Sequence, residues 1–256
     1  MIHETAIVHP AAEIGEGVEI GPYSVIGENV KIGNGCYIGP HVVIEGWTTL
    51  GENNRVFQFA SVGAQPQDLK FAGEKSELII GSGNTIRESV TLHRGTSGGG
   101  GVTRIGDNNL FMAYVHVGHD CHIGNFCVFA NVATLAGHVV VEDYAILGGV
   151  CAVHQFTRIG AHVMASGGSM IAKDLPPYTM AQGDRARVMG INVTGLKRRG
   201  FSAETISVIK KVYKLYYRSG LLAEEALTEI ENLFGDIKEA MAFCGFIKAS
   251  ERGVTR

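Results

Sequence analysis

Histidine is the side chain through which this sequence could carry out chemistry near neutral pH, because imidazole exchanges its proton in that range. The 256-residue chain contains ten histidines, and one of them, His119, is followed directly by Asp120. A neutral imidazole can accept a proton from a substrate, and a neighbouring carboxylate stabilises the imidazolium ion that results. The pair therefore indicates general base catalysis, with a histidine-ligated metal as the alternative.

The metal alternative lacks most of the ligands that it would need. The five cysteines are odd in number and form no C-x-x-C pair, and no cluster of Asp or Glu accompanies the histidines. The γ-class carbonic anhydrases use a pair of histidines five residues apart, a spacing that occurs nowhere among these ten. We expect no metal, no cofactor and no disulfide, and keep a metal protein of that class as a minor alternative.

A six-residue repeat organises most of the chain and would position these histidines. Steps of six from Ile2 to Val62 meet an aliphatic residue at all eleven positions. The repeat resumes at Ile80, slips by one residue across Gly98–Gly101 and continues from Ile105 to Ile171. Neither a helical period nor simple alternation gives this pattern, whereas short strands joined by turns do. With 35 glycines for the turns, the sequence predicts a mainly β protein, a parallel β-helix of hexapeptide repeats.

The repeat predicts which histidines share a face. Three hexads make one coil of eighteen residues, so the hexads that begin at positions 92, 117, 135 and 153 stack upon each other. Adjacent coils lie about 4.8 Å apart, which brings their side chains within reach of one another. These four hexads carry His93, His119, His138 and His154, with His116 at the corner just before them. The remaining outward histidines are interpreted as solvated surface residues, and four inward cysteines as small buried side chains.

A change of composition after Pro176-Pro177 marks the end of the repeats. Ser202 is a typical N-cap, and apolar residues at helical spacing follow it as far as Gly220. Residues 223–234 and 236–249 read as two more helices. We therefore predict two domains, a β-helix over residues 1–190 and a helical domain over residues 191–256.

Charge and hydropathy exclude several classes of protein. Lys and Arg total 22 against 25 Asp and Glu, a net charge of −3 that does not suit a nucleic-acid-binding chain. No run of about 18 apolar residues exists, and the N-terminus lacks the features of a signal peptide. These observations predict no membrane span, no nucleic-acid partner and a cytoplasmic location.

Seven short strings together resemble one enzyme family, the UDP-N-acetylglucosamine O-acyltransferases. They are QDLKFAG at 67–73, IRE at 86–88, HRGT at 93–96, HVGHDC at 116–121, LAGHV at 135–139, HQF at 154–156 and GLKRRGF at 195–201. The resemblance covers essentially the whole chain and implies a left-handed β-helix, although general rules favour right-handed parallel crossovers. It also implies a homotrimer with sites between subunits.

The activity implied by the resemblance is acyl transfer in the first step of lipid A synthesis. An (R)-3-hydroxyacyl chain moves from acyl carrier protein to the 3-hydroxyl of UDP-N-acetylglucosamine. In this reading His119 is the general base with Asp120 as its partner, and the backbone N–H of Gly137 stabilises the oxyanion. The alternatives are the 3-amino analogue of the sugar, the related N-acyltransferase or another hexapeptide acyltransferase, and a non-catalytic hexapeptide scaffold.

The resemblance also implies a set of substrate-binding residues. The sugar and its phosphates would contact Asp68, Lys70, His116 and His138, and the nucleotide or its diphosphate Gln155, Asn192, Arg198 and Arg199; His93 and His154 would line the acyl side. A residue in the late coils blocks the end of the acyl groove in this family, and the matching position here is Gly167, which predicts a long acyl chain. Family members often carry Glu where this chain has Thr194, which leaves the strength of nucleotide binding open.

A basic segment supports an acidic partner. From Leu196 to Arg218 the chain has seven Lys and Arg and only Glu204 of the opposite sign, a net charge of +6. Such a patch suits acyl carrier protein, which is strongly acidic. The alternative interpretation is a solvated helix face.

Overall fold

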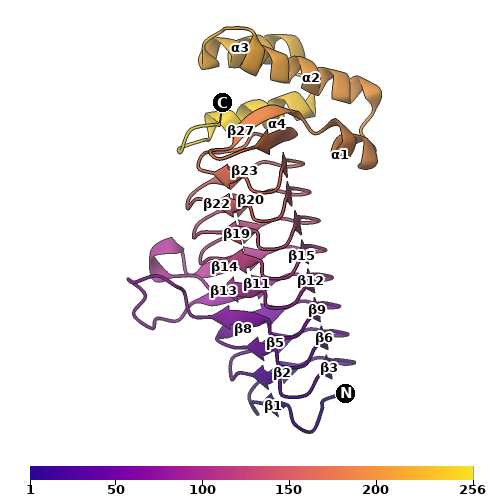
Figure 1. Ribbon diagram of the computed structural model, residues 1–256, viewed down its shortest axis with the longest axis vertical. Helices are drawn as coiled ribbons and strands as arrows, with labels where there is room; N and C mark the ends of the chain where they lie inside the picture. The colour runs from indigo at the N-terminus through magenta and orange to yellow at the C-terminus, as the bar shows by residue number, and fades with distance from the viewer. Residues whose placement is uncertain (256) are drawn as a thin grey trace.

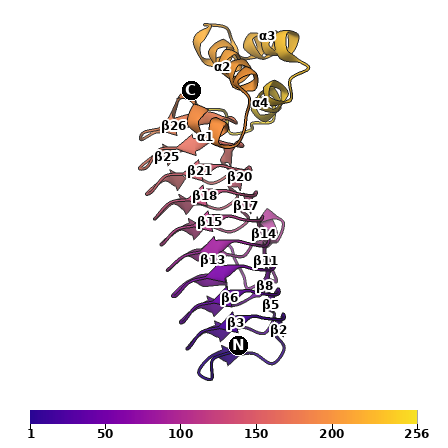
Figure 2. The same cartoon turned by 90° about the vertical axis from the view of Figure 1, so that its right-hand side faces the viewer.

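The computed structural model describes residues 1–255 as a tall stack of coils with helices at the C-terminal end (Figure 1). Each coil contributes one short strand to each of three parallel sheets, and the coils lie on top of one another along the whole stack (Figure 2). Equivalent residues lie eighteen apart, so that Ile7 pairs with Val25 and Val25 with Val43. The predicted three-hexad coil is therefore confirmed.

The three sheets run the length of the stack. Sheet I consists of β1 (Ile7–Val8), β4 (Val25–Ile26), β7 (Val43–Ile44), β10 (Ser61–Ala64), β13 (Thr91–His93), β16 (His116–Val117), β19 (Thr134–Leu135), β22 (Ala152–Val153) and β25 (Met170–Ile171). Sheet II consists of β2 (Glu13–Ile14), β5 (Lys31–Ile32), β8 (Trp47–Leu50), β11 (Glu77–Ile80), β14 (Val102–Ile105), β17 (His122–Ile123), β20 (Val140–Val141) and β23 (Arg158–Ile159). Sheet III consists of β3 (Glu19–Ile20), β6 (Tyr37–Ile38), β9 (Arg55–Val56), β12 (Thr85–Ile86), β15 (Leu110–Phe111), β18 (Val128–Phe129), β21 (Ile146–Leu147), β24 (Met164–Ala165), β26 (Thr179–Gln182) and β27 (Arg187–Ile191).

The core is a single column enclosed by the three sheets. In each two-residue strand the second side chain points inward, as Ile38 and Leu135 do, and from β3 onward it is buried. The fifth residue of each hexad is the other inward side chain, which is why four cysteines are buried in the column. All five cysteines of the chain are free thiols. Burial raises the pKa of Cys121 and Cys127 to about 12, which leaves their thiols unreactive.

Two loops leave the coils on the side of sheets I and II, at residues 65–76 and 94–101 (Figure 1). Trp47 of β8 pairs with Glu77 of β11, 30 residues on, and Glu77 pairs with Val102 of β14, 25 residues on. The first loop thus adds two hexads and leaves the phase of the repeat unchanged. The second adds one hexad and one residue, which accounts for the slip across Gly98–Gly101. A short 3₁₀ turn, η1 (Ser97–Gly99), lies within this second loop.

The C-terminal region closes one end of the stack. Sheet III continues past the two prolines, because β26 pairs parallel to β24 and β27 returns antiparallel to β26, a hairpin that the sequence analysis did not predict. The helices are α1 (Val193–Arg198), α2 (Ala203–Arg218), α3 (Ala223–Phe234) and α4 (Lys238–Lys248). Three of these match the predicted helices, and the hydroxyl of Ser202 accepts a hydrogen bond from the Thr205 N–H at 3.1 Å, as an N-cap does.

The predicted boundary at residues 190 and 191 falls on the last residues of β27. Whether the two parts are independent folding units stays a prediction. Within residues 1–255, none of the helices combines the length and the hydrophobicity that crossing a lipid bilayer requires.

Candidate active site

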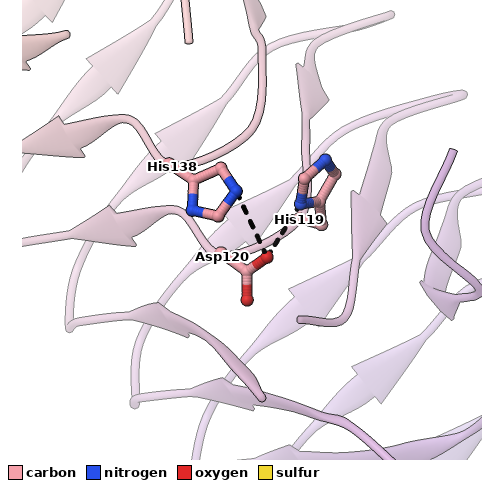
Figure 3. A group of neighbouring side chains, drawn as sticks. All are labelled: His119, Asp120 and His138. Atoms are coloured by element: carbon pink, nitrogen blue, oxygen red, sulfur yellow. Dashed lines mark hydrogen bonds and ion pairs between the residues drawn. The ribbon is translucent and has the colours of Figure 1, made fainter. Parts of the chain in front are cut away.

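His119 and Asp120 occupy a turn at the corner between sheets I and II, between β16 and β17 (Figure 3). Their side chains are joined by a hydrogen bond of 2.8 Å between His119 Nδ1 and Asp120 Oδ2. A carboxylate only accepts, so Nδ1 carries the proton and Nε2 keeps a lone pair for a substrate proton. The His119 side chain is 15% exposed and that of Asp120 is fully buried. This is the geometry of an oriented general base.

The Asp120 carboxylate is held by groups from another loop. The Thr96 N–H donates to Oδ1 at 2.9 Å and the Thr96 hydroxyl donates to Oδ2 at 2.6 Å. The Asp120 N–H donates in turn to the Thr103 hydroxyl at 2.8 Å, in a turn where Asp120 has a φ of 59°. One donor on Oδ1 and two on Oδ2, counting His119 Nδ1, fix the direction of the carboxylate.

His138 lies one coil above His119, and the two rings meet edge to face with centroids 5.0 Å apart (Figure 3). Its Nε2 is 3.8 Å from Asp120 Oδ2, and its other face stacks on Phe156 at 4.4 Å. Burial lowers the pKa of His138, and the nearby His119 adds to this, while Asp120 and Asp68 oppose it. His138 is therefore neutral at pH 7 and can donate or accept a hydrogen bond.

Gly137 lies directly against the His119 ring. A Cβ placed on Gly137 would be 2.5 Å from His119 Cε1 and 2.6 Å from Nε2, closer than any side chain allows. The Gly137 N–H donates no hydrogen bond to the described part of the chain. An N–H group that lacks an acceptor, on a residue that lies against the base, is suited to a developing oxyanion.

His93, in the coil below, and His116, in β16 just before His119, form a second histidine pair. Their rings meet edge to face at 5.1 Å, and His116 Nδ1 lies 2.7 Å from the Thr91 hydroxyl. Burial, with smaller contributions from His116 and His119, lowers the pKa of His93 to about 4, and burial also lowers that of His116. The Nδ1 atom of His93 is buried without a hydrogen-bond partner. Both rings are thus neutral surfaces beside the base.

The loop at 65–76 brings Asp68 toward this cluster. Asp68 Oδ1 accepts a hydrogen bond of 3.0 Å from the Lys70 N–H, and its charge acts on His138. The Lys70 side chain is exposed. The structure of one chain therefore joins Asp68 to the histidine cluster and leaves Lys70 free to reach outward.

The acyl-side residues lie farther along sheet I. His154 and Gln155 form the next turn above His138 and are exposed, and the Arg252 guanidinium donates to His154 Nδ1 at 2.8 Å. Gly167 lies across sheet I, in the turn between β24 and β25. Gly167 is exposed, and a Cβ there would approach nothing closer than the Gly149 carbonyl oxygen at 3.2 Å.

Three of the four residues expected at the nucleotide, all except Gln155, lie at a different corner. Asn192 caps α1: its Oδ1 accepts from the Gly195 N–H at 3.0 Å, and its Nδ2 donates to the His162 carbonyl at 2.9 Å. The Arg199 guanidinium lies over the Tyr144 ring, 4.7 Å from its centroid, and Arg198 is exposed. These residues adjoin the turns between sheets II and III, so the width of sheet II separates them from His119. One chain alone does not bring the two groups together.

Comparisons with known proteins identify the family of the chain. Residues 174–255 match the family described as UDP-N-acetylglucosamine O-acyltransferase, domain 2, and residues 11–46 and 103–137 match the six-repeat bacterial transferase hexapeptide family. Over 255 residues the chain is 55% identical to the acyl-[acyl-carrier-protein]–UDP-N-acetylglucosamine O-acyltransferase of Myxococcus xanthus, covering 100% of this chain and 99% of that protein. This chain belongs to the UDP-N-acetylglucosamine O-acyltransferase family. It is 51% identical over 256 residues to the Stenotrophomonas maltophilia protein of the same name, covering 100% and 97%.

Solved structures of this acyltransferase family share the fold over the whole chain. The UDP-N-acetylglucosamine acyltransferase of Francisella novicida superposes with a TM-score of 0.98 at 44% identity, covering 100% of this chain and 94% of that one. That of Arabidopsis gives a TM-score of 0.87 at 38% identity, with both chains fully covered. The fold is thus the left-handed β-helix with a C-terminal helical region, as predicted, and the chain is an acyltransferase.

The sequence analysis of this acyltransferase did not predict three residues around the histidine cluster. Thr96 holds Asp120, Phe156 stacks on His138, and Arg252 bonds to His154. The slip in the repeat indicated the loop that carries Thr96, and Phe156 directly follows His154 and Gln155, which were predicted as site residues. No local pattern indicates the contact of Arg252 with His154, because it joins residues 98 positions apart.

Proposed function

We propose that this acyltransferase moves an (R)-3-hydroxyacyl chain from acyl carrier protein to the 3-hydroxyl of UDP-N-acetylglucosamine in lipid A synthesis, with His119 as general base. The observation that carries the proposal is the His119–Asp120 pair, whose ring lies against Gly137, a residue with an unbonded N–H. A positioned base of this kind typically contributes about 10²–10⁴ in rate.

The reaction follows from this geometry. His119 Nε2 removes the proton of the sugar 3-hydroxyl while its oxygen attacks the thioester carbonyl carbon. Charge develops on the carbonyl oxygen, where the Gly137 N–H stabilises it, and Asp120 stabilises the imidazolium. The tetrahedral intermediate then expels the carrier thiolate, which takes the proton from His119. His119 donates its Nδ1–H to Asp120 at 2.8 Å, whereas His138 Nε2 lies 3.8 Å from the same carboxylate, and this supports His119 as the base.

The binding roles rest on position. Asp68, His116 and His138 lie beside the base on the sugar side, with Lys70 reaching outward from the loop of Asp68, and His93 and His154 adjoin the base along sheet I. Of the nucleotide residues, Gln155 lies beside His154, and Asn192, Arg198 and Arg199 form a separate group at the corner between sheets II and III. Because sheet II separates His119 from Arg199 within a chain, a homotrimer would allow one subunit to supply the base and its neighbour the arginines. The enzyme would act in the cytoplasm, where its acyl carrier is made.

A groove between α2 and α3 supports the proposed docking of the carrier. It encloses about 520 Å³ and is lined by Lys211, Lys214, Leu215, Arg218, Ser219, Leu233 and Phe234. A basic rim around an apolar floor suits an acidic helical partner. The basic residues of this groove belong to the basic segment at residues 196–218.

The open turn at Gly167 supports a long acyl chain. Each buried methylene favours binding by about 0.8 kcal/mol, so four carbons would change selectivity more than a hundredfold. Met164 lies on sheet III and Met170 on sheet I, so that the two methionines flank the turn that contains Gly167. We expect the wild type to prefer C14 over C10 hydroxyacyl carriers and Gly167→Met to reverse this. A wild type that prefers C10, or a variant with unchanged selectivity, would remove Gly167 as the ruler.

The function itself is tested by mass spectrometry of products. Purified enzyme is incubated with hydroxyacyl carriers of several lengths and with UDP-N-acetylglucosamine or its 3-amino analogue. An ester-linked product from the first sugar is expected. An amide from the analogue alone would assign the chain to that sugar, and no product with either would reject the proposal.

A further inference from the structure

The glycine-rich loop at residues 94–101 covers the buried carboxylate of Asp120. Thr96 is 5% exposed and touches both carboxylate oxygens, through its N–H at 2.9 Å and its hydroxyl at 2.6 Å. The second of these oxygens, Oδ2, is also the one that accepts the proton of His119 Nδ1 at 2.8 Å. The Thr96 hydroxyl therefore fixes the rotation of the carboxylate that faces His119.

The loop is shaped to fit closely around Asp120. A Cβ on Gly99 would overlap the Asp120 carboxyl group, and one on Gly95 would lie 2.7 Å from Oδ1. Only glycine at these positions lets the loop backbone approach the carboxylate so closely. The extra seven residues that interrupt the hexads thus have a local purpose, which is to enclose Asp120.

A second loop braces the first from outside. Glu74, in the loop that carries Asp68, accepts hydrogen bonds of 3.1 Å from both the N–H and the hydroxyl of Ser97. These donors, with the Ala72 N–H, lower the pKa of Glu74 to about 2, so the brace stays charged at any physiological pH. Ser97 is the neighbour of Thr96, but its hydroxyl faces Glu74 instead of Asp120.

We infer that Thr96 is a positioning residue for catalysis: its hydroxyl holds Asp120 in the rotamer that orients His119 and supports the imidazolium. This inference rests on the proposed role of His119 as general base. It adds a residue outside the dyad, on an inserted loop, whose hydroxyl is the second donor on Oδ2 beside His119 Nδ1.

The test is Thr96→Val, which keeps the shape of the side chain and removes the hydroxyl. With (R)-3-hydroxytetradecanoyl carrier protein, kcat should fall about 10- to 100-fold, while KM for UDP-N-acetylglucosamine stays within about twofold. The acid limb of kcat/KM should move to lower pH, because the imidazolium loses its carboxylate partner. The other groups that face the ring are His93, His116 and His138, with Asp68 beyond, and all of them are unchanged. Thr96→Ser should restore both kcat and the acid limb.

Ser97→Ala is the matched control, since it removes the adjacent hydroxyl that bonds Glu74; its acid limb should coincide with that of the wild type. Circular dichroism corrects each rate for the folded fraction, and Thr96→Ala carries the same test if the valine variant does not fold. A Thr96→Val enzyme with wild-type kcat, or with a loss but an unmoved acid limb, would overturn the inference. His119→Ala in the same assay separates the two proposals: if it stays active, the base assignment itself fails.

Discussion

His41 and His138 occupy the same position of their hexads in the two halves of the β-helix, His41 at the corner between sheets III and I and His138 at the corner between sheets I and II, and their surroundings differ. Both have left-handed backbone conformations, with φ of 56° and 61°. His41 is exposed and stacks between Tyr23 and Phe59, with ring centroids 5.2 Å and 5.4 Å away. His138 is half-buried, stacks on one aromatic ring and faces a carboxylate that a loop holds in place.

The difference shows where this fold can place chemistry. The core uses only the two inward side chains of each hexad, so turn residues can vary without loss of the column. Turn residues of successive coils still stack at the strand spacing, which aligns side chains at no cost to the core. At the corner between sheets III and I the stack that includes His41 is aromatic and exposed. At the corner between sheets I and II the inserted loops enclose the stack that includes His138, which becomes a site with donors and acceptors in fixed directions.

The largest effect should come from His119→Ala, set against His41→Ala. Loss of the base should lower kcat about 10²- to 10⁴-fold without changing the melting temperature, because the His119 side chain lies outside the core. His41→Ala should leave kcat unchanged. Steady-state kinetics and thermal melts measure both. A His119→Ala enzyme that keeps more than about a tenth of kcat would rule out the general base role.

Gly137→Ala should cost about 10²-fold in kcat, because the added methyl must displace the His119 ring by an ångström or so. The reason is the 2.5 Å that would separate its Cβ from His119 Cε1. Gly190→Ala is the control, since a Cβ there meets nothing within 4 Å. Similar kcat values for the two variants would mean that the ring is free to move, and would weaken the contrast between the two halves.

The repeat made the fold predictable, because every hexad repeats the same physical requirement. In each hexad a small and an aliphatic residue point inward, and a turn follows. Because this pattern is so regular, the slip at Gly98–Gly101 could be recognised as an interruption of the repeat. The hairpin at β26 and β27 was not predicted, since the two prolines there suggested an end, and the pairing of β26 with β24 depends on contacts beyond the local sequence.

The site was predictable only in part. Gly137 and His138 come eighteen and nineteen residues after His119, so that their closeness follows from the stacking of coils. Thr96 does not, because the path of an inserted loop is set by contacts such as that of Ser97 with Glu74 and has no period. The separation of Arg199 from His119 likewise needed the coil geometry, since both belong to motifs of the same family.

Acid should destabilise the second half of the β-helix through its buried histidines. The folded-state pKa of His93 is about 4, below the 6.5 of the unfolded chain, and the pKa values of His116 and His138 are also lowered. As pH falls below 6.5 the unfolded state takes up these protons first, so stability present above pH 7 is lost toward pH 4. His93 alone would account for up to about 3 kcal/mol. Urea unfolding at pH 7.5 and 5 should show a smaller loss for His93→Leu than for the wild type; equal losses would contradict the assignment.

The smallest effect is expected at the basic helix, which lies far from the base. Lys210, Lys211 and Lys214 are exposed on α2, and the last two line the groove beside α3. Reversing all three to Glu should raise KM for acylated carrier protein about tenfold at low salt and leave UDP-sugar binding unchanged, because the charges attract the carrier without touching the sugar site. The effect should shrink by 0.5 M salt, where the screening length is only a few ångströms. A variant whose carrier kinetics at low salt match the wild type would show that this helix face is merely solvated, and that the second half of the molecule binds its carrier elsewhere.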